Sequence, residues 1–428
     1  MSADAALAVN PPKFRWAQLV IGIACMVMIA NLQYGWNLFV NPIDQKYHWG
    51  RAAIQVAFAI FIFTETWLVP VEGWFVDRYG PRVVVLFGGV LVAIAWALNS
   101  VASHLYVLYA AAVISGVGAG AVYGTCVGNA LKWFTDRRGL AAGLTAAGFG
   151  AGAAATVVPI RDFIASSGYE AAFLWFGLGQ GLVILILANF LRAPEPGEVP
   201  TPSSTRLRQS ARNFTWREML STPLFWVLYV MFVLVAAGGL MATAQLASIA
   251  LDFGVADKPI SIIGITGTTL SIALVVDNVL NGLARPFFGW VSDMIGREIT
   301  MFIVFSAGAV SMWALSAFGQ SPWMFVLLGG AIYFTWGEIY SLFPSICTDA
   351  YGSKYAATNA GCLYTAKGTA SLLVPLASVV VSTTGNWQTV FAIAAIMDVI
   401  AAVMAIAVLK PLRASHHAHL SAGAARTA

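Results

Sequence analysis

Two basic residues stand inside long apolar stretches of this sequence and are the first candidates for chemistry. Arg285 lies in the stretch 262–290, and Lys367 lies in the stretch 356–383. An ionisable side chain in lipid is costly unless it is paired or faces water, so both residues are functional candidates. A guanidinium binds a carboxylate through two parallel hydrogen bonds, and an ammonium adds a point charge. The two cations therefore predict a site for a small organic anion, and a dicarboxylate would satisfy both of them.

Four acidic residues also fall inside apolar stretches, namely Glu65, Asp277, Glu338 and Asp398. Asp277 precedes Arg285 by about two helical turns and is expected on the same helix face. An acid in the same cavity can neutralise one cation, which would favour a monocarboxylate, or it can titrate and couple the anion to protons. Each acid can instead pair with a neighbouring base or cap a broken helix. The sequence leaves these alternatives open.

The elements that must position these residues are predicted to be membrane-spanning helices. Hydrophobic residue types make up 59% of the 428 residues, charged types make up 10%, and the mean hydropathy is +0.78. A soluble domain is about one quarter charged, so most of the outer surface of this chain must face lipid. The net charge of +4 is modest and does not indicate a nucleic-acid partner. The four cysteines form no metal-ligand pattern, and we expect no metal, no cofactor and no bound ATP.

Twelve segments reach the length of about 20 residues that a helix needs to cross the hydrocarbon core. Backbone groups find no water in lipid, so segments this long and apolar are expected to be helical. At about 1.5 Å per residue, Arg285 lies roughly 12 Å and Lys367 roughly 20 Å from the nearest loop, close to the middle of the membrane. The segments are residues 16–40, 52–76, 82–101, 104–130, 139–161, 171–192, 222–246, 262–290, 299–319, 322–347, 356–383 and 387–410.

A polar stretch rich in proline and arginine separates the sixth segment from the seventh. The predicted organisation is therefore a tail, a six-helix half, a central loop, a second six-helix half and a second tail, at residues 1–15, 16–192, 193–221, 222–410 and 411–428. If both termini lie on one side of the membrane, that side receives seventeen of the 23 lysines and arginines. The positive-inside rule then places both termini and the central loop in the cytoplasm.

One sequence pattern occurs twice, about half the chain apart. The first copy reads Gly73-Trp74-Phe75-Val76-Asp77-Arg78-Tyr79-Gly80-Pro81-Arg82, and the second reads Gly289-Trp290-Val291-Ser292-Asp293-Met294-Ile295-Gly296-Arg297. Both fit G-W-x-x-D-x-x-G, which indicates two halves related by a parallel repeat. A glycine here allows close helix approach, and an aspartate can meet helix ends and basic groups of the other half. Such contacts would break and form again as the halves move.

This duplicated loop resembles the signature of the major facilitator superfamily, in which the loop between the second and third helices reads G-x-x-x-D-R-x-G-R-R or similar. The resemblance covers essentially the whole chain. It implies an all-α membrane protein with twelve transmembrane helices in two six-helix halves, which rock about a central cavity in alternating access. It also implies gating roles for Gly73, Asp77, Arg78, Arg82, Gly289, Asp293 and Arg297.

The segments around the two cations narrow the resemblance. They read Asn281-Gly282-Leu283-Ala284-Arg285-Pro286 and Tyr364-Thr365-Ala366-Lys367-Gly368, and they are similar to the family of bacterial oxalate:formate antiporters. That resemblance implies that Arg285 and Lys367 bind the substrate carboxylates. Phenol hydroxyls and the positive edges of aromatic rings suit a small anion. The implied lining residues are Gln33, Tyr34, Tyr123, Trp336, Tyr340 and Tyr364.

The sequence also departs from that family. Phe149 stands where a tyrosine is expected, Tyr364 stands where a tryptophan is expected, and Glu65, Asp277 and Glu338 are additional acids and candidates for coupling. In an empty cavity two desolvated cations would resist closure, which favours exchange over free uniport.

The leading prediction is a gradient-driven exchanger of small carboxylates, of the oxalate:formate type, in the bacterial inner (plasma) membrane. A proton-coupled monocarboxylate symporter and a major facilitator carrier of an unrelated organic solute are the alternatives. A membrane enzyme or receptor ranks below them, because no nucleophile–base pair or ATP-binding loop supports it. Partners are expected to be the anion and the lipid bilayer. The sequence does not determine the oligomeric state, and a monomer is the working expectation.

Overall fold

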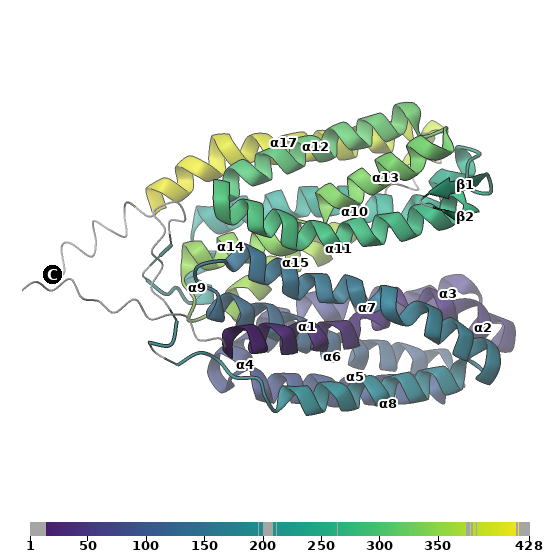
Figure 1. Cartoon of the computed structure of the whole chain (residues 1–428), viewed down its shortest axis with the longest axis horizontal. Coiled ribbons are helices and arrows are strands. Elements are labelled where there is room, and N and C mark those ends of the chain that lie inside the picture. The colour runs from purple at the N-terminus through teal and green to yellow at the C-terminus, as the bar shows by residue number, and fades with distance from the viewer. Residues whose placement is uncertain are drawn as a thin grey trace, which may run out of the picture.

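The computed structural model describes residues 14–195, 197–199, 209–210, 212–262, 264–373, 377, 380–381, 383–416 and 418. Within these residues the chain is helical except for one small hairpin and the connecting turns. Figure 1 shows two bundles of roughly parallel helices, one above the other, with the first half of the chain in the lower bundle. Residues 1–13 and 419–428 of the predicted tails (1–15 and 411–428), and residues 200–208 of the predicted central loop, lie outside the described residues.

The first bundle is built from eight helices. They are α1 (Phe14–Tyr34), α2 (Asn37–Tyr47), α3 (Arg51–Trp67), α4 (Val69–Tyr79), α5 (Pro81–Ser100), α6 (Leu105–Trp133), α7 (Arg138–Ser167) and α8 (Tyr169–Ala188).

The second bundle follows the short helix α9 (Trp216–Leu220), which a Thr215–Glu218 capping box begins. Its elements are α10 (Pro223–Asp252), β1 (Pro259–Ile262), β2 (Ile265–Thr268), α11 (Thr269–Ile295), α12 (Arg297–Phe318), α13 (Pro322–Trp336), α14 (Ile339–Tyr351), α15 (Ala356–Ser371), α17 (Gln388–Met404) and the π-helical turn η1 (Ala405–Leu409).

Three of the predicted spans are broken rather than continuous. The segment 16–40 is interrupted between Tyr34 and Asn37, and the segment 322–347 is interrupted at Gly337 and Glu338. The segment 52–76 bends by 42° between α3 and α4, where Pro70 lies in the first turn of α4 and cannot donate a backbone hydrogen bond. The predicted segments thus contain breaks, and the first two breaks lie beside predicted lining residues.

The prediction that a helix begins at residue 262 is also wrong. Residues 259–268 form an antiparallel hairpin, with Pro259 opposite Thr268 and Ile262 opposite Ile265. Gly264 adopts a φ of 81° in the turn, a conformation that glycine adopts without strain. The backbone N–H of Ser271 then donates to the Thr268 hydroxyl, and the helix begins at Thr269. An apolar run rich in β-branched residues suits a strand as well as a helix, and the chain is therefore not wholly α-helical.

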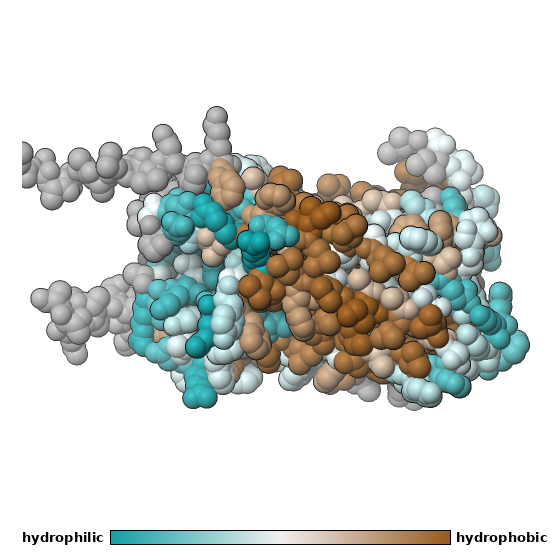
Figure 2. Space-filling view, turned by 90° about the horizontal axis from the view of Figure 1, so that it is seen from below, coloured by the Kyte–Doolittle hydropathy of each residue, from teal (hydrophilic) through white to brown (hydrophobic). Residues whose placement is uncertain are grey.

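The surface of the molecule matches a lipid environment. Figure 2 shows a continuous apolar band over the middle of one face, with hydrophilic residues gathered towards both ends. Eight described helices are long and apolar enough to cross a membrane, or nine if α3 and α4 form one bent span. The helices α7, α11 and α15 are not among them, although they lie at three of the twelve predicted segments. The predicted total of twelve therefore stays a prediction.

Candidate functional site

Arg285 is held between the two bundles by groups of three helices. The side chain is 2% exposed and projects from α11. Its Nη1 donates to the backbone oxygen of Ala146 on α7 at 2.7 Å, and its Nη2 donates to Asn281 Oδ1 at 2.8 Å. The guanidinium carbon lies 4.5 Å from the ring centre of Tyr340 on α14, within range of a cation–π interaction. The Nε atom has no hydrogen-bond partner among the described residues, so one donor of the guanidinium stays available.

Lys367 approaches the same tyrosine from α15. Its Nζ donates to the Tyr364 hydroxyl at 3.0 Å and lies 5.8 Å from the ring centre of Tyr340. Its other close partner is Glu65 of α3, whose Oε2 lies 3.4 Å from Nζ. Lys367 and Glu65 are both buried, and they belong to different bundles. The structure thus brings both predicted cations against one ring, and it gives Lys367 an acidic partner.

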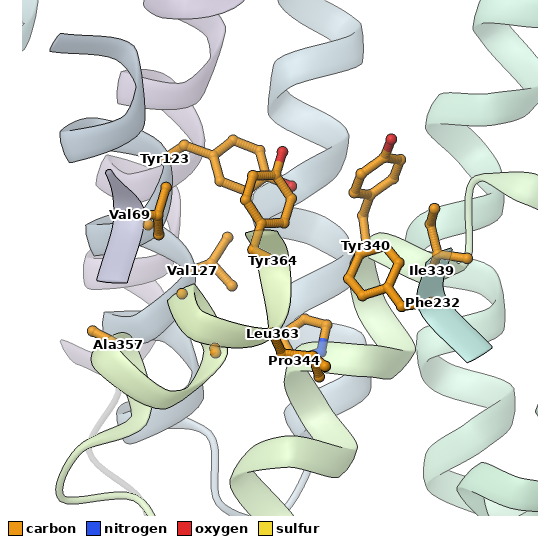
Figure 3. A pocket seen from close by; sticks show the side chains of 13 residues that line it. Val69, Tyr123, Val127, Phe232, Ile339, Tyr340, Pro344, Ala357, Leu363 and Tyr364 are labelled. Carbon is orange, nitrogen blue, oxygen red and sulfur yellow. The ribbon is translucent and has the colours of Figure 1, made fainter. Parts of the chain in front are cut away.

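An uninterrupted series of ring contacts borders the two cations and crosses from the first bundle to the second. Phe149, which stands where a tyrosine was expected, lies between two tyrosine rings and contributes packing without a hydroxyl. Figure 3 shows Tyr123, Tyr364 and Tyr340 at one end of a narrow cavity whose other walls are mostly apolar. The successive ring centres are 5.4 Å apart for Tyr34 and Phe149, 5.6 Å for Phe149 and Tyr123, 5.0 Å for Tyr123 and Tyr364, 6.4 Å for Tyr364 and Tyr340, and 5.7 Å for Tyr340 and Trp336.

Two other predicted lining residues present buried polar atoms without partners in the described part of the chain. Gln33 Oε1 and Trp336 Nε1 are both in this condition. The Trp336 ring packs directly over Gly239 of α10, where any side chain would collide with it. Leaving a buried donor or acceptor unsatisfied costs about 1–3 kcal/mol, so these atoms are suited to contact a polar ligand or water.

The three candidate coupling acids lie in three different environments. Glu65 pairs with Lys367, which is the structural alternative that the sequence left open. Asp277 faces Gly329 and Gly330 of α13 inside the second bundle, and neither of its carboxyl oxygens has a hydrogen-bond partner among the described residues. Glu338 occupies the break between α13 and α14, and neither of its carboxyl oxygens has a hydrogen-bond partner among the described residues.

Sequence reasoning missed Glu72 and the role of Asn281. Glu72 is a buried acid on α4 that faces Gly120 of α6. It falls inside the predicted segment 52–76, so the rule that identified Glu65 would have found it as well. Asn281 lies one helical turn before Arg285, and a short polar side chain at this spacing is a signal for a hydrogen bond to the arginine.

The duplicated aspartates join the two bundles by a symmetrical pair of helix caps. Asp77 of the first bundle accepts hydrogen bonds from the backbone N–H and the hydroxyl of Thr358, in the first turn of α15, at 2.9 and 2.6 Å. Asp293 of the second bundle accepts hydrogen bonds from the backbone N–H groups of Gly139 and Leu140, in the first turn of α7, at 3.0 and 2.9 Å. A carboxylate at a helix N-terminus satisfies free donors and the helix dipole. We call this end of the molecule the motif end.

Glycines allow the bundles to approach closely at the motif end. A Cβ atom on Gly73 would lie 2.6 Å from the backbone of Ala357, and one on Gly289 would collide with the backbone of Gly139. Arg78 and Arg82 do not take part, because Arg78 lies over Trp74 and Arg82 donates to Asn189, both in the first bundle.

Buried ion pairs extend the motif end into the second bundle. Arg297 Nη1 lies 2.6 Å from Asp293 Oδ1, and Arg297 Nε donates to Asp349 Oδ2 at 3.0 Å. The other oxygen of Asp349 accepts from Arg138 Nη1 of the first bundle at 2.8 Å. Lys132 also lies 2.6 Å from Asp77. The predicted gating residues Asp77, Asp293 and Arg297 therefore share one polar layer at which the bundles meet.

Comparisons with known proteins agree with this architecture. The sequence model of the Major Facilitator Superfamily matches residues 19–263 and again residues 246–427. The chain is 35% identical over 399 residues to the oxalate:formate antiporter of Oxalobacter formigenes, covering 92% of this chain and 91% of that protein. It is 25% identical to human monocarboxylate transporter 11, over 76% of this chain and 67% of that protein. The solved structure of the E. coli fucose:proton symporter FucP aligns with a TM-score of 0.67 at 16% identity, covering 92% of this chain and 98% of that chain, and shows a similar fold.

We expect the Gly73→Ala variant to weaken the motif end. The added Cβ would lie 2.6 Å from the Ala357 backbone, and α4 and α15 must separate to accommodate it. Overpacking of this kind costs about 1–3 kcal/mol. The first turn of α15, including the Thr358 N–H, should exchange its amide hydrogens faster when followed by mass spectrometry.

Gly282→Ala is the matched control, because a Cβ at this α11 position meets nothing within 4 Å. Equal exchange rates in the two variants would show that the close approach at Gly73 does not hold the bundles together.

Proposed function

The chain belongs to the major facilitator superfamily, and from this premise we propose that it is a secondary active transporter of small carboxylates. The antiporter relative and the fucose:proton symporter that shares its fold are transporters, and this chain is a transporter rather than an enzyme. The two bundles would move about the cavity that Tyr123, Tyr340 and Tyr364 line, in the alternating access that two repeated units permit.

The proposed topology has twelve spans, in two halves at residues 16–192 and 222–410. Nine spans, counting the bent pair as one, are supported by length and composition. The remaining three correspond to α7, α11 and α15, which supply groups to the interior. The excess of lysines and arginines at the motif end supports a cytoplasmic location for that end, the central loop at 193–221 and both tails. The bacterial inner membrane is the proposed location.

The observation that carries the proposal is the placement of two buried cations against one tyrosine ring at a cavity between the bundles. The free Nε–H of Arg285 and the phenol hydroxyls around it offer donors to one carboxylate. A buried cation is stabilised by an anion, and charge-assisted hydrogen bonds are about twice as strong as neutral ones. The name of the Oxalobacter relative, an oxalate:formate antiporter, gives the same class of ligand.

Exchange is the transport mode that we expect from the properties of the carrier without a bound anion. Without an anion, Arg285 keeps its charge in a site with two hydrogen-bond acceptors and no carboxylate partner among the described residues. Closing the bundles around such a cation carries a desolvation penalty that a bound carboxylate would offset. The loaded carrier should therefore change conformation faster than the empty one.

Glu65 favours a second candidate, proton-coupled transport of a monocarboxylate. With Glu65 on Lys367, Arg285 is the one of these two cations that lacks an anionic partner among the described residues, so a ligand of charge −1 balances the site. A dicarboxylate would have to displace Glu65 to use both cations. The structure thus offers a monocarboxylate such as formate the simpler electrostatic fit.

We expect labelled oxalate or formate to enter liposomes that contain the protein and the unlabelled anion, and to enter liposomes without internal anion much more slowly. Arg285→Ala should lower exchange by at least about tenfold, which corresponds to about 1.4 kcal/mol of lost binding. Arg161→Ala is the control, because Arg161 is an exposed arginine that pairs with the adjacent Asp162.

Two results would contradict this proposal in different ways. If neither anion exchanges under any loading, the class of substrate is wrong. If exchange occurs and Arg285→Ala leaves it unchanged, the protein transports carboxylates through another site.

We expect Glu65→Gln to shift selectivity towards dicarboxylates. Glutamine keeps the size of the side chain and removes the charge, so Lys367 becomes available to a second carboxylate. The ratio of oxalate to formate exchange should rise by about tenfold, as expected for about 1.4 kcal/mol of altered preference. Asp277→Asn removes a buried acid that does not pair with either cation, and it should leave the ratio unchanged. An unchanged ratio in Glu65→Gln would mean that Glu65 does not set the charge of the site.

A further inference from the structure

Two arginines from distant parts of the chain border one open groove at the motif end. Arg78 belongs to α4 of the first bundle and Arg217 belongs to α9, and both line a groove of about 380 Å³. The buried sulfur of Met219 in α9 lies 3.9 Å from that of Cys347 in α14, so α9 is attached to the second bundle. Figure 1 shows α4 and α9 at the same end of the molecule. One water takes up about 30 Å³ in the liquid, so the groove has room for a much larger group.

Both arginines keep an uncompensated charge in the part of the chain that the structure describes. Arg78 is exposed, and its guanidinium carbon lies 5.5 Å from the ring centre of Trp74. Arg217 is also exposed, and its guanidinium carbon lies 5.1 Å from the ring centre of Trp216. Neither guanidinium forms an ion pair or a side-chain hydrogen bond with another described residue. Each therefore has its hydrogen-bond donors available to a ligand.

The acids near the groove are already matched by other bases. Asp77, which lines the groove, lies 2.6 Å from Lys132, and Glu218 of α9 lies 2.6 Å from Arg212. Lys354, whose neighbour in the sequence lines the groove, is exposed and forms no ion pair among the described residues. The groove is therefore positively charged and should attract an anion.

The exposed face of α4 continues from this groove as an apolar stripe. Val71, Trp74 and Phe75 are 55%, 42% and 44% exposed. Together with Arg78 they have the spacing i, i+3, i+4, i+7, so the four side chains share one face of the helix. The helix belongs to a bent pair that is apolar enough to cross a membrane, and tryptophan is common where lipid meets water. The stripe thus presents apolar side chains to lipid and ends in a cation.

An anionic phospholipid matches both the groove and the stripe. A guanidinium binds a phosphate through two parallel hydrogen bonds, which suits the available donors of the two arginines. Basic pockets between helices at the cytoplasmic side of a membrane are suited to anionic headgroups, and the motif end is the end proposed to be cytoplasmic. The acyl chains of the lipid would lie along the stripe, which a soluble phosphate would leave uncovered.

We propose that the groove between α4 and α9 binds the headgroup of one anionic phospholipid, with Arg78 and Arg217 on its phosphate. The two arginines belong to different bundles, so both can hold the phosphate only while the bundles meet at the motif end. A ligand that binds one state more tightly shifts the protein towards that state. The lipid would therefore favour the closed motif end, whichever solute the protein carries.

The test measures lipid binding by the purified full-length protein in a neutral detergent. Phosphatidylglycerol is added in steps, and the melting temperature is recorded at each step. The melting temperature of the wild-type protein should rise with phosphatidylglycerol, because a ligand of the folded state stabilises it. Phosphatidylcholine or inorganic phosphate at the same concentration should have little effect. Arg78→Ala and Arg217→Ala should each weaken the apparent affinity for phosphatidylglycerol by at least about tenfold.

Arg137→Ala is the matched control for the two groove variants. Arg137 is an exposed arginine at the motif end, directly before α7, and it does not line the groove. Its removal should leave the affinity for phosphatidylglycerol within about twofold of wild type. Each variant is compared with its own lipid-free state, and the two arginines are replaced separately, so that a loss of stability in one variant leaves the other informative.

Amide hydrogen exchange tests the predicted effect on conformation. Phosphatidylglycerol should slow exchange in the first turn of α15, which Asp77 caps across the bundles, in the wild-type protein and in Arg137→Ala. It should not do so in Arg78→Ala or Arg217→Ala. Unchanged exchange in the wild-type protein, despite lipid binding, would contradict the bridge between the bundles.

Three outcomes would overturn the lipid site. Equal stabilisation by phosphatidylglycerol and phosphatidylcholine would show that the charge of the headgroup is not recognised. Equal stabilisation by inorganic phosphate would assign the groove to a soluble anion. A loss of affinity in Arg137→Ala as large as in the groove variants would indicate attraction to the whole basic surface. Absence of formate and oxalate exchange would contradict the proposed transport and leave this inference standing.

Discussion

A guanidinium that leaves water must recover its lost hydration from the protein, and Arg285 shows how this constraint shapes the interior. The Ala146 carbonyl, the Asn281 amide and the Tyr340 ring each replace part of the hydration shell. None of the three carries a negative charge, so the cation is solvated without being neutralised. A neutral cage of this kind keeps the electrostatic attraction for an anion while making the buried charge tolerable. These three groups belong to α7, α11 and α14, so the cage requires these helices to pack against one another.

Lys367 meets the same constraint in a different way. Its partner Glu65 is charged and belongs to the other bundle, so the ion pair both neutralises the lysine and bridges α3 and α15. The two cations are therefore not equivalent: one is solvated by dipoles and the other by a counter-charge. In the proposed transport, an incoming carboxylate would reach Arg285 without disturbing an ion pair among the described residues. The asymmetry gives the site a preferred charge and links the second cation to the relative position of the bundles.

Sequence rules for apolar segments identified the buried charged residues, but these rules did not identify the partners of those residues. Arg285, Lys367 and Glu65 were found because ionisable groups in apolar segments are rare. The pairing of Glu65 with Lys367 joins positions 302 residues apart, and no single-sequence pattern specifies a contact at that separation. The hairpin at 259–268 was missed because its β-branched residues are as apolar as the residues of a membrane helix. Hydropathy alone does not distinguish the two structures. The breaks at Gly35 and Gly337 were missed because glycine is common within membrane helices and only packing decides which one interrupts the helix.

The contacts at the motif end differ from those of the central site in how easily they can be replaced. Asp77 and Thr358 border an open groove with Arg78, Arg217 and Tyr355, so water can reach this cap when the bundles separate. A hydrogen bond exchanged for one to water contributes only about 0.5–1.5 kcal/mol net, and several can break at modest cost. Glu65 and Lys367 have no such access, since both side chains are almost fully buried. Opening the motif end is therefore a reversible exchange of protein contacts for water, whereas separating the central pair requires a ligand or proton that takes the place of the lost charge. Under the proposed alternating access, this difference would let the motif end open at low cost while the central pair responds to a bound anion.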